Sequence, residues 1–223
     1  MKAGVIGTVD GNFDALESFE TTVKQGDFEL KRCIDVRRGF TLPSGIEAYY
    51  GHAAMEQVKD REQVMIQNGE ISIYEEPQKV PSYTEFLTVP GEVVVVDSGA
   101  GSFAYSMIGS QTNTNIERAE INLSGFAADH EDDSDPWKVG FYGHLGNAEN
   151  GVVHGTDLLS DDELSGVLHE SNLNQLGVEY PYDGQMLKAN MAESGYFEIY
   201  QPSNYESKDY LQFILDEVIH YLK

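Results

Sequence analysis

Basic residues are scarce in this sequence. The 223 residues include 14 Lys and Arg against 38 Asp and Glu, a formal net charge of -24 at pH 7. A charge this far from zero opposes compaction by self-repulsion unless mobile ions screen it. The acidic residues are spread along the whole chain, so a localised acidic tail that binds a partner is not indicated. Dispersed acidity with few lysines instead predicts a surface adapted to concentrated salt.

Cysteine and long apolar runs are also nearly absent. Cys33 is the only cysteine, which excludes an intramolecular disulfide and gives no support for an oxidising compartment. No run approaches the 18 or so apolar residues of a membrane span, and the first residues do not form a signal peptide. With 40% hydrophobic and 11% aromatic residues, the chain can still build a core. We therefore expect a folded cytoplasmic protein without a membrane partner.

Several local catalytic motifs are missing as well. No Gly-Lys dipeptide occurs, which excludes a Walker A loop, and there is no G-x-S-x-G or H-E-x-x-H motif. A triad assembled from distant residues stays open, because triads are recognised by geometry. These absences favour a non-enzymatic protein and indicate no cofactor.

The first half of the chain predicts strands with one early helix. Alternation of small and β-branched residues predicts a strand over residues 3–9, and similar patterns predict strands over 28–36 and 46–52. Asn12 is a plausible helix cap, and apolar residues at helical spacing after it predict a helix over residues 13–25. The four residues that set this spacing are Phe13, Leu16, Phe19 and Val23.

The middle of the chain contains the clearest hairpin signal. Asn68-Gly69 between two apolar alternations predicts a tight β-turn, because both residues tolerate positive φ. Three prolines in residues 77–91 predict a surface connection, the best candidate for a domain boundary. The run Val93–Val96 predicts a strand buried on both faces, and a helix is expected over 103–108.

The last third predicts a three-stranded antiparallel meander. Its strands are expected over residues 176–182, 185–191 and 196–200, followed by an amphipathic helix that begins after Ser207. Hairpins interspersed with single helices indicate an α+β fold: mainly antiparallel sheet, with several helices packed on it. The chain is expected to form one domain, or two closely packed halves that meet at residues 77–91.

A glycine-rich turn is the first candidate site. Gly99-Ala100-Gly101-Ser102-Phe103-Ala104 has the form G-x-G-x-x-A between an expected strand and helix. In dinucleotide-binding folds, such glycines let the backbone approach a pyrophosphate. Gly99, Gly101 and Ser102 are therefore candidate nucleotide-binding residues. The βαβ continuation of those folds is missing here, which favours a tight turn after a buried strand.

An acidic segment is the second candidate. Asp129, Glu131, Asp133 and Asp135 alternate along the chain, and carboxylate oxygens at such spacing are ligands for hard cations. The segment lacks the central glycine and the terminal bidentate glutamate of a calcium-binding loop. We therefore interpret it mainly as a solvated loop and keep the four residues as weak metal-ligand candidates.

A cluster of cations is the third candidate. Lys31, Arg32, Arg37 and Arg38 supply four of the 14 basic residues within eight positions. On a regular strand they divide between two faces, whereas a turn after Val36 gathers Arg37 and Arg38. Such a cluster on an acidic protein suits a phosphate or an acidic partner. The alternative is pairing with nearby Asp and Glu side chains.

Two resemblances follow from these patterns. The overall composition resembles that of cytoplasmic proteins from salt-accumulating halophilic archaea. A fainter similarity is to the RdgC family, ring-forming proteins that encircle duplex DNA. It is carried by the segment Val93–Ser102, by Trp137–Phe141 and by the meander through Gly184 and Lys188. That resemblance implies DNA binding and assembly into a homo-oligomer.

The function that these features indicate is binding or assembly. We expect a non-enzymatic protein of a halophilic cell that has a macromolecular partner and is linked to nucleic-acid maintenance. These features are also compatible with a homo-oligomer. Aromatic residues on the meander agree with a nucleic acid as partner, because bases stack on such sheets. These are Tyr180, Tyr182, Tyr196 and Tyr200. The alternative is an enzyme that uses a nucleotide or dinucleotide at residues 99–104.

Overall fold

The computed structural model describes the chain except for residues 146–147, 157, 159 and 161–171. Strands dominate it, with 59% of the residues, and helices account for 18%. In chain order the elements are β1 (Ala3–Asp10), β2 (Phe19–Gln25), β3 (Phe28–Thr41), β4 (Glu47–Gln67), β5 (Glu70–Val89), β6 (Val93–Val96), η1 (Gly99–Ser102), α1 (Phe103–Thr112), β7 (Asn115–Arg118), α2 (Leu123–Asp129), β8 (Asp135–Leu145), β9 (Ala148–His154), β10 (Asn172–Tyr182), β11 (Gln185–Ala192), β12 (Tyr196–Gln201), α4 (Ser207–Phe213), η2 (Ile214–Val218) and η3 (Ile219–Tyr221).

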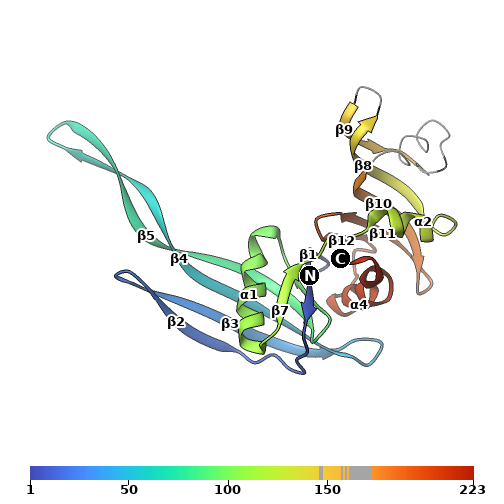
Figure 1. Ribbon diagram of the computed structural model, residues 1–223, viewed down its shortest axis with the longest axis horizontal. Helices are drawn as coiled ribbons and strands as arrows, with labels where there is room; N and C mark the ends of the chain where they lie inside the picture. Colours follow the sequence, from blue (N-terminus) through green and yellow to red (C-terminus); the bar gives the residue numbers. More distant parts are fainter. Residues whose placement is uncertain (146–147, 157, 159, 161–171) are drawn as a thin grey trace.

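One continuous sheet organises the molecule. Its strand order is β2-β3-β4-β5-β6-β1-β12-β11-β10-β8-β9, and β7 pairs with β1 beside this path. Every described pairing is antiparallel. Strand β1 lies between β6 and β12 and so joins the strands of the first half of the chain to the C-terminal meander (Figure 1).

The core lies on both faces of this sheet. All four valines of β6 are 0% exposed, and their side chains alternate between two apolar clusters. Val94 and Val96 belong to the cluster beneath α1, whereas Val93 and Val95 belong to the larger cluster beneath α2, α4 and η2. The prediction of a strand buried on both faces is confirmed.

The C-terminal prediction is also confirmed. Strands β10, β11 and β12 form the expected meander, and the first two of them join at Asp183-Gly184, both with positive φ. Helix α4 follows and continues through η2, and its buried residues pack on the meander. Helix α1 confirms the helix expected after the glycine turn. Among the described helices, none is both long and apolar enough to cross a membrane.

The expected α+β class is wrong. The molecule is mostly antiparallel sheet rather than a sheet with several helices packed on it. The helix expected over residues 13–25 is absent, because Phe19–Gln25 pair with β3 as strand β2. Phe13 and Leu16 are buried, as the apolar pattern required. Their spacing fits a helix, but here it anchors an irregular segment to the core.

Residues 77–89 are also not a surface connection. They form the second part of β5, paired with β4 and then with β6. Pro77 and Pro81 lack the N–H that a central strand needs, but among the described strands this part of β5 pairs with β4 alone. Its other edge faces solvent, so the missing donors break no ladder.

Candidate functional site

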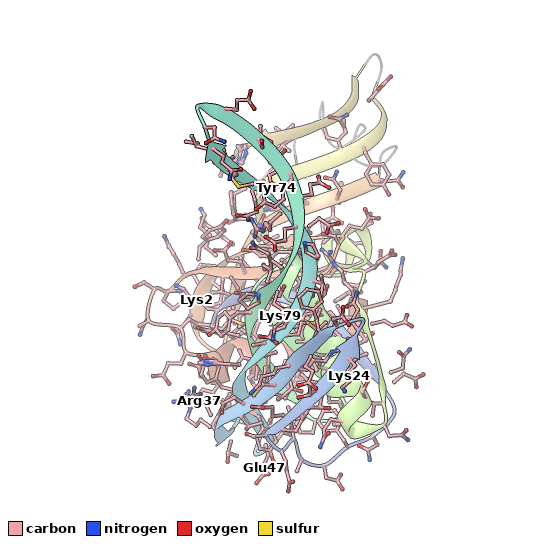
Figure 2. The ribbon with its side chains drawn as sticks, turned by 90° about the vertical axis from the view of Figure 1, so that its left-hand side faces the viewer. Lys2, Lys24, Arg37, Glu47, Tyr74 and Lys79 are labelled. Carbon is pink, nitrogen blue, oxygen red and sulfur yellow. The ribbon has the colours of Figure 1, made fainter. Side chains whose placement is uncertain are left out.

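The outer part of the β4–β5 hairpin is the most unusual surface of the protein. Strand β3 pairs with β4 only as far as Met55, and β6 pairs with β5 only from Phe86 onward. Residues 56–81, here called the outer hairpin, therefore form a two-stranded ribbon that extends away from the rest of the sheet (Figure 1). Figure 2 views this ribbon from its own side of the molecule, with Tyr74 and Lys79 labelled on it.

The turn of this ribbon matches the sequence prediction. Asn68 and Gly69 have φ values of 53° and 83°, as a two-residue turn with positive φ at both positions requires. At the other end, Lys79 fixes the ribbon to the body. Its Nζ atom donates to the Glu29 carbonyl at 3.0 Å and lies 3.6 Å from the carboxylate of Glu56.

Strand register gathers four aliphatic side chains on one face of the ribbon. Val64 lies directly opposite Ile73, and Ile66 lies opposite Ile71. Directly opposed residues project to the same face of a sheet, as do residues two apart on one strand. Together they form a patch, here called the aliphatic patch. The exposed fractions are 65% for Val64, 75% for Ile66, 68% for Ile71 and 66% for Ile73.

The surroundings of the aliphatic patch are polar but almost uncharged. From Gln63 to Tyr74 the one charged residue is Glu70, in a chain with a net charge of -24. The ribbon ends in the polar run Gln67-Asn68-Gly69-Glu70, so the apolar groups lie along its side rather than at its end. On the body side, the next pair on this face is Glu62 opposite Glu75. This surface offers apolar contact area and no acid–base chemistry.

The sequence contained the signal for this patch. Alternation of Val64 with Ile66 and of Ile71 with Ile73, around a two-residue turn, places the four side chains on one face. What the sequence did not reveal is that nothing covers that face in the described structure, because coverage depends on how far the neighbouring strands extend.

The predicted basic residues do not form one patch. All four lie on β3, yet Lys31 pairs with Glu20 at 3.1 Å and Arg37 pairs with Asp35 at 2.8 Å. The Arg38 guanidinium lies 5.4 Å from the ring centre of Phe40. Arg32 is exposed, opposite Met55 of β4. Internal pairing, the alternative interpretation of the cluster, describes Lys31 and Arg37.

A bulge in β3 also separates these residues. The pairing with β4 shifts between Val36 and Arg38, which leaves Arg37 as the extra residue. As a result Val36 packs against the cluster beneath α1, whereas Phe40 packs against the cluster on the opposite face. The bulge reverses the alternation that a regular strand gives these cations.

The glycine turn has the predicted strand–turn–helix order without the predicted surroundings. Gly99 and Ser102 lie in the 3-10 turn η1, and α1 begins at Phe103. A Cβ on Gly101 would collide with the Thr84 side chain, so the absence of a side chain at this position lets the turn pack closely against β5. Thr84 donates to the Asp97 carboxylate at 2.6 Å, which keeps an anion beside the turn. The described strands are antiparallel, so the βαβ unit of dinucleotide sites is absent among them.

The acidic candidates for metal binding are dispersed. Asp129 ends α2, and its carboxylate accepts a hydrogen bond from the Tyr221 hydroxyl at 2.9 Å. Asp135 begins β8, while Glu131 and Asp133 are exposed in the turn between the two elements. Within the described part of the chain, no three Asp, Glu, His or Cys side chains are arranged to hold a metal ion.

The meander tyrosines lie on different faces and so give no single stacking surface. Tyr180 and Tyr182 pack edge-on against Phe213, on the side of α4. Tyr196 packs with the cluster beneath α1, and Tyr200 contacts Trp137 at 6.0 Å between ring centres. The hydroxyls of Tyr180 and Tyr182 donate to Glu217 and Asp216, at 3.0 and 2.5 Å.

A pocket of about 450 Å³ lies beside α4. Its lining is acidic and aromatic, and the Gln212 side chain accepts a hydrogen bond from the Ser44 amide and donates one to Asp216. The concentration of carboxylates disfavours nucleotides and other anions. The lining residues are Pro43, Ser44, Tyr182, Asp183, Gln185, Tyr205, Asp209, Gln212 and Asp216.

Comparison with known proteins gives no family to set beside this geometry. No protein-family model matches the chain, and no curated protein matches it.

Proposed function

We propose that this chain is a non-enzymatic binding or assembly protein that makes its contact through the aliphatic patch of the outer hairpin. The observation that carries the proposal is the exposure of Val64, Ile66, Ile71 and Ile73, each 65% or more exposed on one face. Large contiguous apolar patches on a folded protein mark interaction sites. Burial of each such side chain by a partner contributes roughly 1–2 kcal/mol to binding.

The shape of the hairpin supports the same proposal. A two-stranded ribbon is only marginally stable in water by itself. This ribbon continues for ten residues beyond Glu56 to Ile66, with no third strand beside it in the described structure. Contact with a partner offsets the cost of exposing its aliphatic face.

The experiment is site-specific photocrosslinking in the cells that naturally make the protein. A photoreactive amino acid replaces Ile66 on the aliphatic patch, and the matched control replaces Met65 on the opposite face. We expect a discrete adduct from position 66 and a much weaker one from position 65. Equal adducts at both positions, or none at either, would contradict a contact surface on this face.

We also infer that the protein works in concentrated salt, in the cytoplasm of a salt-accumulating cell. With 38 acidic and 14 basic residues, most carboxylates have no basic partner. Tyrosine hydroxyls serve as partners for some of these carboxylates, as in the hydrogen bonds from Tyr182 to Asp216 and from Tyr221 to Asp129. Mobile cations must screen the remaining carboxylates.

Salt dependence of unfolding tests this inference. The midpoint of thermal unfolding is measured in about 0.1 M and about 2 M KCl, where the Debye length falls from about 10 Å to roughly 2–3 Å. We expect the midpoint to rise steeply with salt. An unchanged cooperative transition in dilute buffer would contradict the inference.

A further inference from the structure

We propose that the occupant of the aliphatic patch is the same patch of a second copy of this chain, related by a two-fold axis. This inference rests on the proposed function and identifies its partner. Val64, Ile66, Ile71 and Ile73 of each copy would pack face to face with those of the other. The arrangement is a small two-layer sandwich in which both layers are hairpins.

Charge repulsion permits a second copy at this position. Two chains that each carry -24 repel strongly wherever their bodies approach. The outer hairpin separates the patch from the body: the ten residue steps from Glu56 to Ile66 correspond to about 33 Å of strand. That distance is several Debye lengths even at about 0.15 M salt, about 8 Å each, and more still in concentrated salt. Contact between hairpins therefore leaves the two acidic bodies far apart.

The two carboxylates beside the patch determine the relative direction of the hairpins. Glu62 and Glu75 lie directly opposite each other on the patch face, and neither side chain has an ion pair or hydrogen bond in the described structure. If the two hairpins ran in the same direction, four carboxylates would meet at one end of the interface. If they run in opposite directions, each pair lies beside the uncharged Asn68-Gly69 turn of the other copy. A two-fold axis that lies in the interface plane, perpendicular to the strand direction, gives this second arrangement.

The position of the apolar groups disfavours a lipid bilayer as the occupant. A hairpin that inserts into a membrane needs apolar residues at its end, because unpaired polar groups cost several kcal/mol in hydrocarbon. This hairpin ends in Gln67, Asn68, Gly69 and Glu70, and Glu70 carries a charge. Lateral contact with a flat apolar surface satisfies the patch and leaves the polar end in water.

The size of the interface sets the expected affinity. A patch of a few hundred Å² on each copy, buried twice by symmetry, gives roughly 1,000 Å². This area lies at the lower limit of specific protein interfaces, so we expect a reversible dimer with a dissociation constant on the order of micromolar. The bodies remain free for other contacts.

The test is sedimentation equilibrium of the whole chain in about 2 M KCl, across on the order of 1 to 200 μM, a range around the expected dissociation constant. The wild-type protein should pass from the 24.8 kDa monomer to a dimer of twice that mass. The double variant Ile66→Gln with Ile71→Gln should weaken the dimer on the order of 100-fold or more, because it removes four of the eight aliphatic side chains from one interface. The matched control, Met65→Gln with Tyr74→Gln, changes two residues of the opposite face and should leave the dissociation constant within about threefold.

Any one of three outcomes would overturn the proposal. The first is that the wild-type chain stays monomeric throughout the range. The second is that the patch variant dimerises as well as the wild type, and the third is that the control variant dissociates to the same extent as the patch variant. The first outcome, combined with a position-66 photoadduct that is not a dimer of this chain, would leave the proposed contact surface intact and refute only the choice of partner. Absence of any photoadduct from the patch would refute both.

A measurement on the wild type alone protects the test against variants that fold poorly. Amide hydrogen exchange is compared between a concentrated and a dilute sample of the same protein. We expect exchange at residues 64–66 and 71–73 to slow at least about fivefold in the concentrated sample, because dimer formation suppresses local opening. Exchange that is independent of concentration at these residues would contradict the inference.

Discussion

The two halves of the β4–β5 hairpin differ more than their sequences do. In the inner half, Ala53, Phe86 and Leu87 are 0% exposed, and β3 and β6 flank the pair of strands. In the outer half, Ile66 and Ile71 are 75% and 68% exposed although they are among the most apolar residues of the chain. The same two strands thus contain both core and bare apolar surface. Strand identity does not decide burial; the extent of the neighbouring strands decides it.

The largest expected effect separates the two halves by stability. Leu87→Ala should lower the free energy of unfolding by about 2–5 kcal/mol, because it leaves a cavity in the larger core cluster. Ile71→Ala on the outer hairpin should change it by no more than about 0.5 kcal/mol in the monomer. Urea unfolding in high salt, at protein concentrations too low for dimer formation, measures the free energy of unfolding of both variants. Equal losses would mean that the hairpin end belongs to the monomer's core.

Crowding at the inner half gives the next largest effect. A Cβ on Gly51 would lie 2.5 Å from the ring of Phe86 and 2.7 Å from the Asp35 carbonyl oxygen. Gly51→Ala should therefore cost about 1–3 kcal/mol. Gly39→Ala on β3 is the matched control, because its nearest atoms are 3.5 Å away and its φ is not positive. That variant should be neutral or slightly stabilising in the same unfolding experiment, and a large loss there would show that both strands resist any side chain.

At the end of the hairpin, the turn rather than packing limits substitution. A Cβ added at Gly69 would meet nothing within 4 Å, but the φ of +83° at this residue is strained for any L residue. Gly69→Ala should cost about 1 kcal/mol, and the loss should be confined to the outer hairpin. Hydrogen exchange should accelerate for residues 63–74 while the global unfolding midpoint changes little. Faster exchange in the meander would contradict this separation.

The smallest effect concerns two tyrosines. The hydroxyl of Tyr221, in the body, donates a hydrogen bond to a carboxylate, whereas the hydroxyl of Tyr74, on the outer hairpin, does not in the described structure. Burial, with the hydrogen bond to Asp129, raises the pKa of Tyr221 to about 12 from the ordinary value of 10.0. The folded state therefore holds this proton more tightly. The resulting stability is fully present below pH 10 and is lost as the pH rises from 10 to about 12.

Tyr221→Phe should remove a few tenths of a kcal/mol of this alkaline loss, since Tyr221 is partly solvated and screened. Tyr74→Phe on the hairpin is the control, because the Tyr74 hydroxyl has no hydrogen bond in the described structure. The readout is the free energy of unfolding at pH values of about 9, 10 and 11, which span the ordinary tyrosine pKa. An equal response of both variants would show that the coupling to Asp129 has no energetic role.

Local signals in the sequence predicted several elements correctly. The Asn68-Gly69 turn, the valine strand and the meander turn at Asp183-Gly184 are each determined by the backbone preferences of a few adjacent residues. The failures were non-local. The spacing of Phe13, Leu16 and Phe19 fits a helix, but pairing with β3 decided that Phe19–Gln25 became a strand.

The candidate sites show the same division. The sequence located the cations of β3 but not the bulge at Arg37, which changes the face on which the residues after it lie. It located the glycine turn but not the contact between Gly101 and Thr84. The bulge and this contact both depend on residues far apart in the chain, which single-sequence patterns do not connect.

The sequence by itself determined the charge of the surface, the absence of disulfides and the turns that reverse the chain, because composition and local backbone preference depend on no distant partner. Only the tertiary structure decided which apolar residues are covered. Ile6 and Ile66 have the same side chain, yet the first is 0% exposed and the second 75% exposed. The physical reason is that burial requires atoms from other segments. The described segments supply these atoms around β1 and leave the end of the hairpin without them.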